Sequence, residues 1–126
     1  MPAVPDDEAC VTQCILEARA RLEKALHTSK RNADSAQVLA VSKTKPATLV
    51  RAAWQSGQRA FGENYLQEAL DKQQALSDLT DIEWHFIGPI QSNKTRAIAE
   101  QFAWVHTVER EKVARRLSEQ RPDELG

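Results

Sequence analysis

Apolar residues near the start of the chain recur at intervals of three and four positions, with charged residues at the opposite positions. The apolar set between residues 6 and 27 is Cys10, Cys14, Ile15, Ala18, Leu22, Ala25 and Leu26. A stripe with this period is typical of an amphipathic helix that packs along one face. Acidic residues at positions 6–8 suit the positive end of a helix dipole. We therefore predict a helix over residues 6–27.

Beyond this helix, short apolar runs alternate with helical repeats. The runs begin about 20 to 24 residues apart, at Val38, Ala60, Trp84 and Trp104. They are interpreted as strands, and the first of them (38–41) is expected to be buried on both faces. Helices are predicted over about 46–56, 64–76, 92–102 and 109–120. Gly57 is expected to stop the first of these, and Asn64 with Gln67 resembles a capping box.

Strands that alternate with helices at this pitch form parallel βαβ units with right-handed crossovers. The units differ in sequence, so the repeat is one of architecture. Four successive units fit either a small open α/β sheet or half of a β/α-barrel, and the periodicity alone leaves both open. The pattern therefore predicts an α/β fold class.

The composition argues against several classes of function. The formal net charge is -1, so the chain lacks the strongly basic face of a nucleic acid-binding protein. The acidic first residues do not resemble a secretory signal, and the longest aliphatic run, 38–41, is far too short to span a bilayer. We expect a soluble cytoplasmic protein. Cys10 and Cys14 lack the further ligands of a metal site and are interpreted as small apolar side chains.

Candidate chemistry lies where the strands end, because parallel α/β proteins form their sites at the carboxyl ends of strands. Lys43 shares its parity with Leu39 and Val41, so it projects into the mouth of a barrel if those two face the interior. A lysine there binds a phosphate or attacks a carbonyl, and a second cation such as Lys45 favours the uncharged, reactive amine. The same pattern also fits an ordinary solvated lysine on a loop.

The remaining polar and aromatic residues are interpreted as structural. His85 and His106 have no carboxylate or cysteine at ligand spacing, so they are expected to be core or barrel-lining side chains. Glu63 and Glu68 lack a second acid as catalytic partner. The basic residues within 110–121 alternate with glutamates and are interpreted as a solvated helix face. The tryptophans expected in the core are Trp54, Trp84 and Trp104.

Three ordered motifs closely resemble those of one family. They are residues 40–46 (AVSKTKP), 61–68 (FGENYLQE) and 83–94 (EWHFIGPIQSNK). The chain from about Val38 to Leu125 thereby resembles the pyridoxal phosphate homeostasis proteins, which bind pyridoxal 5′-phosphate (PLP). The resemblance implies a fold-type III barrel similar to the N-terminal domain of alanine racemase. It also implies that Lys43 forms a Schiff base with PLP, that Asn64 lies beside the cofactor, and that His85 lies on the neighbouring strand.

Members of that family are roughly twice as long as this chain. We therefore expect residues 1–126 to be a partial PLP-binding domain. It would be the N-terminal half of a TIM-type (β/α)8 barrel, with a helix at 6–27 ahead of about four βα units over 38–126. In the family, the other half supplies most of the phosphate cup. The cofactor-binding residues predicted on this half are Lys43, Asn64, His85 and Lys45, and no residue is assigned a catalytic or metal-binding role.

The resemblance implies a carrier that holds PLP as a Schiff base and maintains the intracellular supply of this reactive aldehyde. PLP-dependent apo-enzymes are the candidate recipients. Two alternatives stay open. A PLP-dependent amino-acid racemase would exchange the α-proton of alanine or serine in deuterated buffer. A truncated half-barrel without ligand function would show no micromolar affinity for PLP in equilibrium dialysis.

An isolated half-barrel would have two free sheet edges and an uncovered inner face. The edges are the strands at Val38 and Trp104, and unpaired backbone groups and exposed apolar side chains both favour association. We therefore expect residues 1–126 alone to pair with a second copy, dock onto a complementary half-barrel or aggregate. Sedimentation tests this expectation, and a compact monomer with sharp cooperative unfolding contradicts it.

Overall fold

The computed structural model describes residues 8–126, which alternate between strands and helices. The strands are β1 (Ala40–Val41), β2 (Ala60–Glu63), β3 (Glu83–Phe86) and β4 (Trp104–Val105). The helices are α1 (Glu8–Thr28), α2 (Ala47–Gln55), α3 (Leu66–Ala75), α4 (Thr95–Gln101) and α5 (Glu111–Gln120). Short 3-10 helices form η1 (Ser92–Lys94) and η2 (Asp123–Leu125). The four predicted βα units are therefore confirmed.

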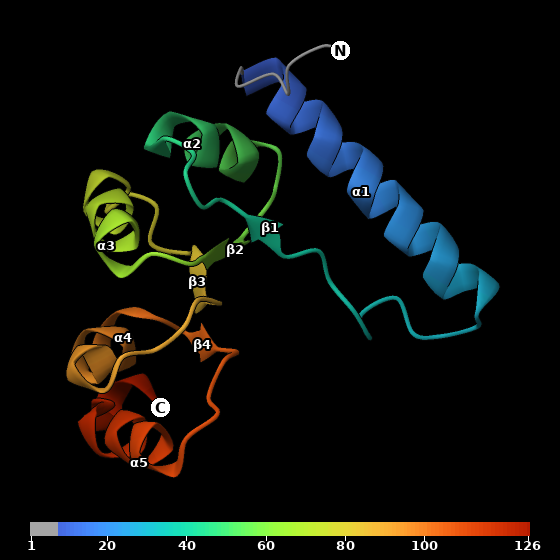
Figure 1. Ribbon diagram of the computed structural model, residues 1–126. Helices are drawn as coiled ribbons and strands as arrows, with labels where there is room; N and C mark the ends of the chain where they lie inside the picture. Colours follow the sequence, from blue (N-terminus) through green and yellow to red (C-terminus); the bar gives the residue numbers. More distant parts are fainter. Residues whose placement is uncertain (1–7) are drawn as a thin grey trace.

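The strands form one sheet in the order β1-β2-β3-β4, and every neighbouring pair is parallel. Helices α2 to α5 curve around one face of this sheet, and α1 packs beside α2 and then extends away from the other helices (Figure 1). A doubly wound sheet would reverse its strand order and carry helices on both faces. Successive strands with helices on one face are instead the arrangement of consecutive units of a β/α-barrel.

The strand register divides the side chains between two faces. One row across the sheet consists of Val41, Gly62, His85 and Trp104. Successive residues of a strand point to opposite faces, and the adjacent row includes Phe61, which packs among the helices. We call the face that carries the Val41 row the inner face and the opposite face the helix face.

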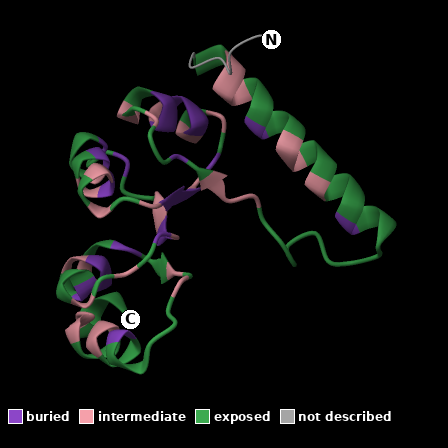
Figure 2. Cartoon of the chain, in the orientation of Figure 1, coloured by how far each residue is buried: buried purple, intermediate pink, exposed green. Residues whose placement is uncertain are grey.

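The hydrophobic core lies between the helix face and the helices. It has two clusters of buried side chains, and Trp84 packs against both. Their members are Ile15, Val50, Ala53, Phe61, Leu76 and Leu79 in the first, and Ala69, Phe86, Ile98 and Phe102 in the second. Figure 2 shows the buried residues on β2 and on the sides of the helices that face the sheet. Burial of this apolar surface is the main term that stabilises the fold.

Two predictions about buried strand residues are wrong for the same reason. The first strand is shorter than 38–41, and Val41 is 52% exposed rather than buried on both faces. Trp104, which was expected in the core, is 57% exposed. Both side chains belong to the inner-face row, whereas the helices that bury the other rows pack on the opposite side of the sheet (Figure 2).

Helix ends differ from the predicted ones in detail. The predicted start of the first helix at residues 6 and 7 lies outside the described residues, and the segment 92–102 begins as η1 before α4. Gly57 is confirmed as the stop of α2, with φ 103. The Asn64 capping box is wrong, because α3 begins at Leu66 and its N-cap, Tyr65, makes no side-chain cap bond. Within residues 8–126, no helix is both long and apolar enough to cross a bilayer.

The basic residues of α5 are only partly a solvated face. Arg116 donates a hydrogen bond to the Ser92 carbonyl, and Arg121 donates to the carbonyls of Ala99 and Phe102. The Ala99 and Phe102 carbonyls lie at the C-terminal end of α4, where the last carbonyls lack intrahelical partners, and Ser92 begins η1 just before α4. Arg116 of α5 and Arg121, which directly follows α5, therefore join this segment to α4, which the alternation with glutamates did not predict.

The packing of the core predicts that removing even one methyl group from a buried side chain lowers the stability of the protein. Ile98 is 1% exposed and contacts the second cluster, so Ile98→Val should lower the free energy of unfolding by about 1 kcal/mol. Urea denaturation measures this. Leu16→Ala is the control, because Leu16 is 47% exposed and its loss should change stability by less than about 0.5 kcal/mol. Equal effects of the two changes would contradict the assigned core.

Candidate functional site

A tight turn directly after β1 carries the candidate lysine. The Lys45 N–H donates to the Ser42 carbonyl at 3.1 Å and closes the turn, and exposed Lys43 and Thr44 are its central residues. Thr44 has φ 64, a left-handed conformation that is uncommon for a β-branched residue. Such backbone strain costs about 1–3 kcal/mol and persists where surrounding contacts over-determine it, often at functional sites. The strain therefore marks this turn as a candidate site.

A buried ion pair lies beneath the turn on the helix face. Lys72 of α3 and Glu63 at the end of β2 are 5% and 0% exposed, and Lys72 Nζ lies 2.7 Å from Glu63 Oε1. The Ser42 hydroxyl donates to the same Oε1 at 2.9 Å. Lys72 Nζ also donates to the Ser42 carbonyl and lies 2.9 Å from Glu68 Oε1. Glu68 in turn accepts a hydrogen bond from the Thr44 N–H.

A second polar chain lies on the inner face. His85 Nε2 lies 2.7 Å from Glu83 Oε1, and His85 Nδ1 lies 2.8 Å from His106 Nε2. The indole of Trp104 stacks on the His85 ring with centroids 6.1 Å apart. His85 is 5% exposed, as expected of a core or barrel-lining histidine, but its contact with the Glu83 carboxylate was not predicted. Glu83 lies two positions earlier on the same strand, so it shares the inner face with His85.

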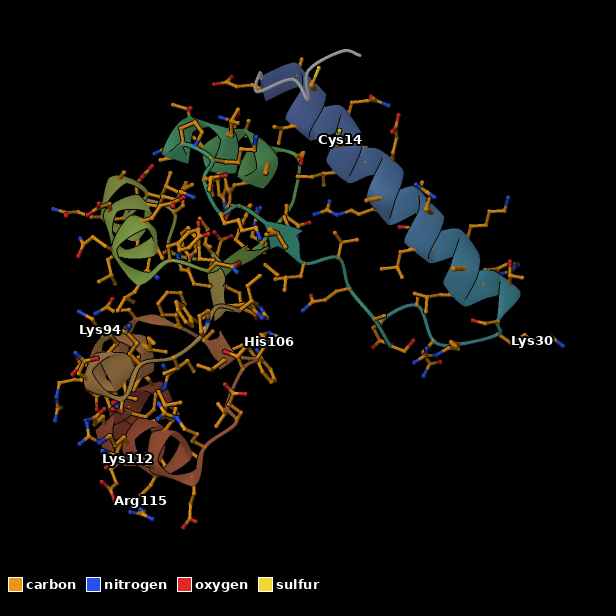
Figure 3. The ribbon with its side chains drawn as sticks, viewed as in Figure 1. Cys14, Lys30, Lys94, His106, Lys112 and Arg115 are labelled. Atoms are coloured by element: carbon orange, nitrogen blue, oxygen red, sulfur yellow. The ribbon has the colours of Figure 1, made fainter. Side chains whose placement is uncertain are left out.

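The turn and the histidine chain meet at one edge of the sheet. Backbone pairing continues past the strand ends, since the N–H groups of Ser42, Ile87 and His106 donate to carbonyls of the neighbouring strands. The strand register aligns Val41, Gly62, His85 and Trp104 in one row. Two residues further along each strand, the same register aligns Lys43, Asn64 and His106. Figure 3 places His106 on the open side of the sheet and Lys94 on the side of the helices.

Asn64 is held where β2 and β3 end. Its Oδ1 atom is buried and has no hydrogen-bond partner within the described part of the chain. Gly88 approaches its backbone so closely that a Cβ at Gly88 would lie 2.1 Å from the Asn64 carbonyl oxygen. Asn64 also lines a cavity of about 330 Å³ together with Pro89 and Lys94. A buried acceptor without a donor is costly unless something completes it, so Asn64 is a candidate ligand contact.

Lys45 lies in different surroundings. It lines a cavity of about 310 Å³ between α1, α2 and β1, together with core residues such as Ile15 and Phe61. The turn at Thr44 separates Lys45 from β1, the strand that leads to Lys43. A role for Lys45 as the second cation beside Lys43 stays a prediction. No group of three or more potential metal ligands occurs among residues 8–126.

Lys72 is the polar residue that the sequence analysis missed. A signal for it was present, because Lys72 lies three residues after Ala69 and four before Leu76 in a stripe that is otherwise apolar and buried. A lysine inside such a stripe requires a partner. Its partner, Glu63, lies at the end of β2, and the spacing of residues along the sequence does not show that the two side chains are close in space.

The fold and this edge together define a class of protein. Consecutive βα units with helices on one face are the features of a segment of a β/α-barrel, and Lys43 lies on the strained turn directly after its first strand. No family model matches the chain.

Relatives of known name support and narrow this class. The chain is 58% identical over 112 residues to the pyridoxal phosphate homeostasis protein of Pseudomonas aeruginosa. This match covers 89% of this chain and 48% of the relative. It is 53% identical over 115 residues to the protein of the same name from Vibrio cholerae, covering 89% of this chain and 49% of the relative. The chain is homologous to the pyridoxal phosphate homeostasis proteins and spans about half the length of these relatives.

Solved structures agree with the sequence comparison. The structure of PipY from Synechococcus elongatus with PLP bound matches with a TM-score of 0.68 and 43% identity, covering 79% of this chain and 47% of that one. The crystal structure of an unknown protein from Bifidobacterium adolescentis matches with a TM-score of 0.78 and 25% identity, covering 95% of this chain and 53% of that one. The four βα units therefore correspond to about half of a larger fold.

The close approach of Gly88 to Asn64 predicts an asymmetry between two glycines. In Gly88→Ala the new Cβ would collide with a backbone carbonyl, so we expect a loss of about 1–3 kcal/mol in the free energy of unfolding. In Gly62→Ala the new Cβ would lie 3.0 Å from Ile87 Cδ1, the movable end of a side chain, and the loss should be smaller. Thermal or urea unfolding of both variants measures the difference, and equal losses would contradict it.

Proposed function

We propose that this chain supplies the lysine end of a PLP site, and that the protein serves PLP homeostasis in the cytoplasm. The observation that carries the proposal is the turn itself. Lys43 stands in an exposed, strained turn. Its neighbour Ser42 is tied to the buried Lys72–Glu63 pair, and its neighbour Thr44 is tied to Glu68, which contacts Lys72. The names of the relatives and the PLP bound to PipY support the choice of ligand.

The chemistry of Lys43 follows from its exposure and its neighbours. PLP supplies an aldehyde carbon, which is an electrophile. With PLP bound, Lys43 would be the residue that holds this carbon, and the aldehyde would supply reversible imine chemistry with the loss of one molecule of water. The reaction is reversible, which suits a protein that holds a reactive aldehyde and later releases it.

The other predicted contacts fit the same ligand. The unpartnered Asn64 Oδ1 suits a hydrogen-bond donor on or near the ligand. His85 is oriented by Glu83 and His106 on the inner face, so its ring is fixed before any ligand arrives. Lys45 is proposed as a nearby cation rather than as a direct contact. These three assignments are proposals for residues whose chemistry fits an aromatic aldehyde phosphate.

The inner face suggests the protein partners. Val41 and Trp104, at the two ends of its row, are more than half exposed. We propose that a complementary half-barrel or a second copy covers this face, as the other strands of a barrel would. PLP-dependent apo-enzymes are proposed as recipients of the released cofactor.

The proposal is tested by comparing two lysines. With PLP added, the parent protein should absorb in the visible, and borohydride should fix the adduct on Lys43. Lys43→Ala should abolish the visible band, because the amine that forms the imine is gone. Lys94→Ala should keep the band, since this change leaves the Lys43 amine in place, although Lys94 lines the same cavity as Asn64.

Peptide mapping of the reduced protein gives the deciding result. Adducts mainly on Lys45 or Lys94 would overturn the assignment to Lys43. Absence of any visible band in the parent would overturn the proposed function itself.

A further inference from the structure

We propose that Lys72, Glu63 and Glu68 are positioning residues, which hold the backbone of Lys43 so that its amine points to one place. The proposal concerns the turn, and it rests on the proposed function only for the identity of the ligand. The buried ion pair lies on the helix face, opposite the side toward which the lysine is expected to project. It therefore acts through the backbone and not by contact with the ligand.

Both peptide groups that bracket Lys43 are anchored by this cluster. The carbonyl of the preceding peptide belongs to Ser42 and accepts a hydrogen bond from Lys72 Nζ. The N–H of the following peptide belongs to Thr44 and donates to Glu68 Oε1. Two anchored peptide planes determine the backbone dihedrals of the residue between them, and hence the direction of its Cα–Cβ bond. The amine of Lys43 thus starts from a fixed direction.

The anchor itself is held firmly. The Lys72 ammonium has three N–H donors and three oxygen neighbours, which belong to Ser42, Glu63 and Glu68. Glu63 is 0% exposed and also accepts from the Ser42 hydroxyl. Hydrogen bonds between charged groups in a dry interior are short and directional. Movement of the turn would break several of them together.

The cluster also accounts for the conformation of Thr44. A threonine at φ 64 is strained, and its N–H bond to Glu68 holds it there. A turn of this strain without an anchor would relax toward other conformations and turn the Lys43 side chain elsewhere. The strained backbone of Thr44 and its hydrogen bond to Glu68 therefore act together to keep the Lys43 side chain in one direction.

Glu68 gives the cleanest test, because it is partly exposed and its loss leaves the buried pair intact. Amide hydrogen exchange at Thr44 should become about tenfold faster in Glu68→Ala, the scale on which a hydrogen bond to a charged acceptor contributes. Glu68→Gln keeps an acceptor oxygen and should restore slow exchange to within about threefold. Asp71→Ala is the matched control, because it removes an exposed carboxylate from the same helix.

A second readout separates positioning from a merely structural role. With PLP as the probe and borohydride as the trap, the parent should be labelled on Lys43. In Glu68→Ala the rate of labelling at Lys43 should fall about fivefold or more, and the share on Lys45 should rise. Glu68→Gln should recover the parental pattern, and Asp71→Ala should match the parent throughout.

The buried pair is tested by a double change. Lys72→Met alone would leave the Glu63 carboxylate buried without its cation, which is strongly destabilising. Lys72→Met combined with Glu63→Gln removes both charges, and it should lower the rate of labelling at Lys43 at least as much as Glu68→Ala. If the double variant does not fold, the Glu68 variants decide the question.

The outcomes distinguish this proposal from the proposed function. Unchanged Thr44 exchange in Glu68→Ala would overturn the anchoring. Faster exchange with unchanged rate and distribution of labelling would show that the anchor does not position Lys43, and would overturn the proposal. A parent protein that PLP never labels at Lys43 would overturn the proposed function, while the exchange measurements would still test the anchor.

Discussion

The buried ion pair between Lys72 and Glu63 is the constraint on which the candidate site depends. Taking two charges out of water is costly. The cost is partly offset here, because Lys72 has three oxygen neighbours and Glu63 Oε1 has two donors, while Glu63 Oε2 has no hydrogen-bond partner in the described part of the chain. The pair joins α3 to the end of β2 and to the turn after β1. The same contacts that hold α3 against the sheet thus also hold the segment around Lys43, so local packing and site geometry are coupled.

The hydrophobic core and the histidine chain of the candidate site lie on opposite faces of the sheet. The helix face of the sheet carries the aromatic and aliphatic core, and the inner face carries Glu83, His85 and His106 in a hydrogen-bonded chain. Residues on the inner face have no part in the core clusters and are free to be polar. A barrel uses the same division, with packing against the helices outside and loops that carry function at the carboxyl ends of the strands.

The homology to the pyridoxal phosphate homeostasis proteins covers most of this chain but only about half of those relatives. The residues described here belong to the lysine end of the proposed site. Contacts to the phosphate and covering of the inner face are expected from other strands of a complete barrel. The arrangement explains how an open half-sheet can contain a well-anchored lysine and still expose Trp104 and Val41.

The sequence by itself determined the order of strands and helices, the α/β class and the position of Lys43 after the first strand, because periodicity and motif are local properties. The sequence also predicted correctly that Gly57 stops α2. Only the tertiary structure decided that Lys72 pairs with Glu63, that Glu83 orients His85, and that Trp104 lies outside the core. These outcomes depend on which face of the sheet the helices cover and on which distant residues meet across it. A hydrophobic pattern records that a residue is apolar or charged, but it does not record the neighbour that makes its burial favourable.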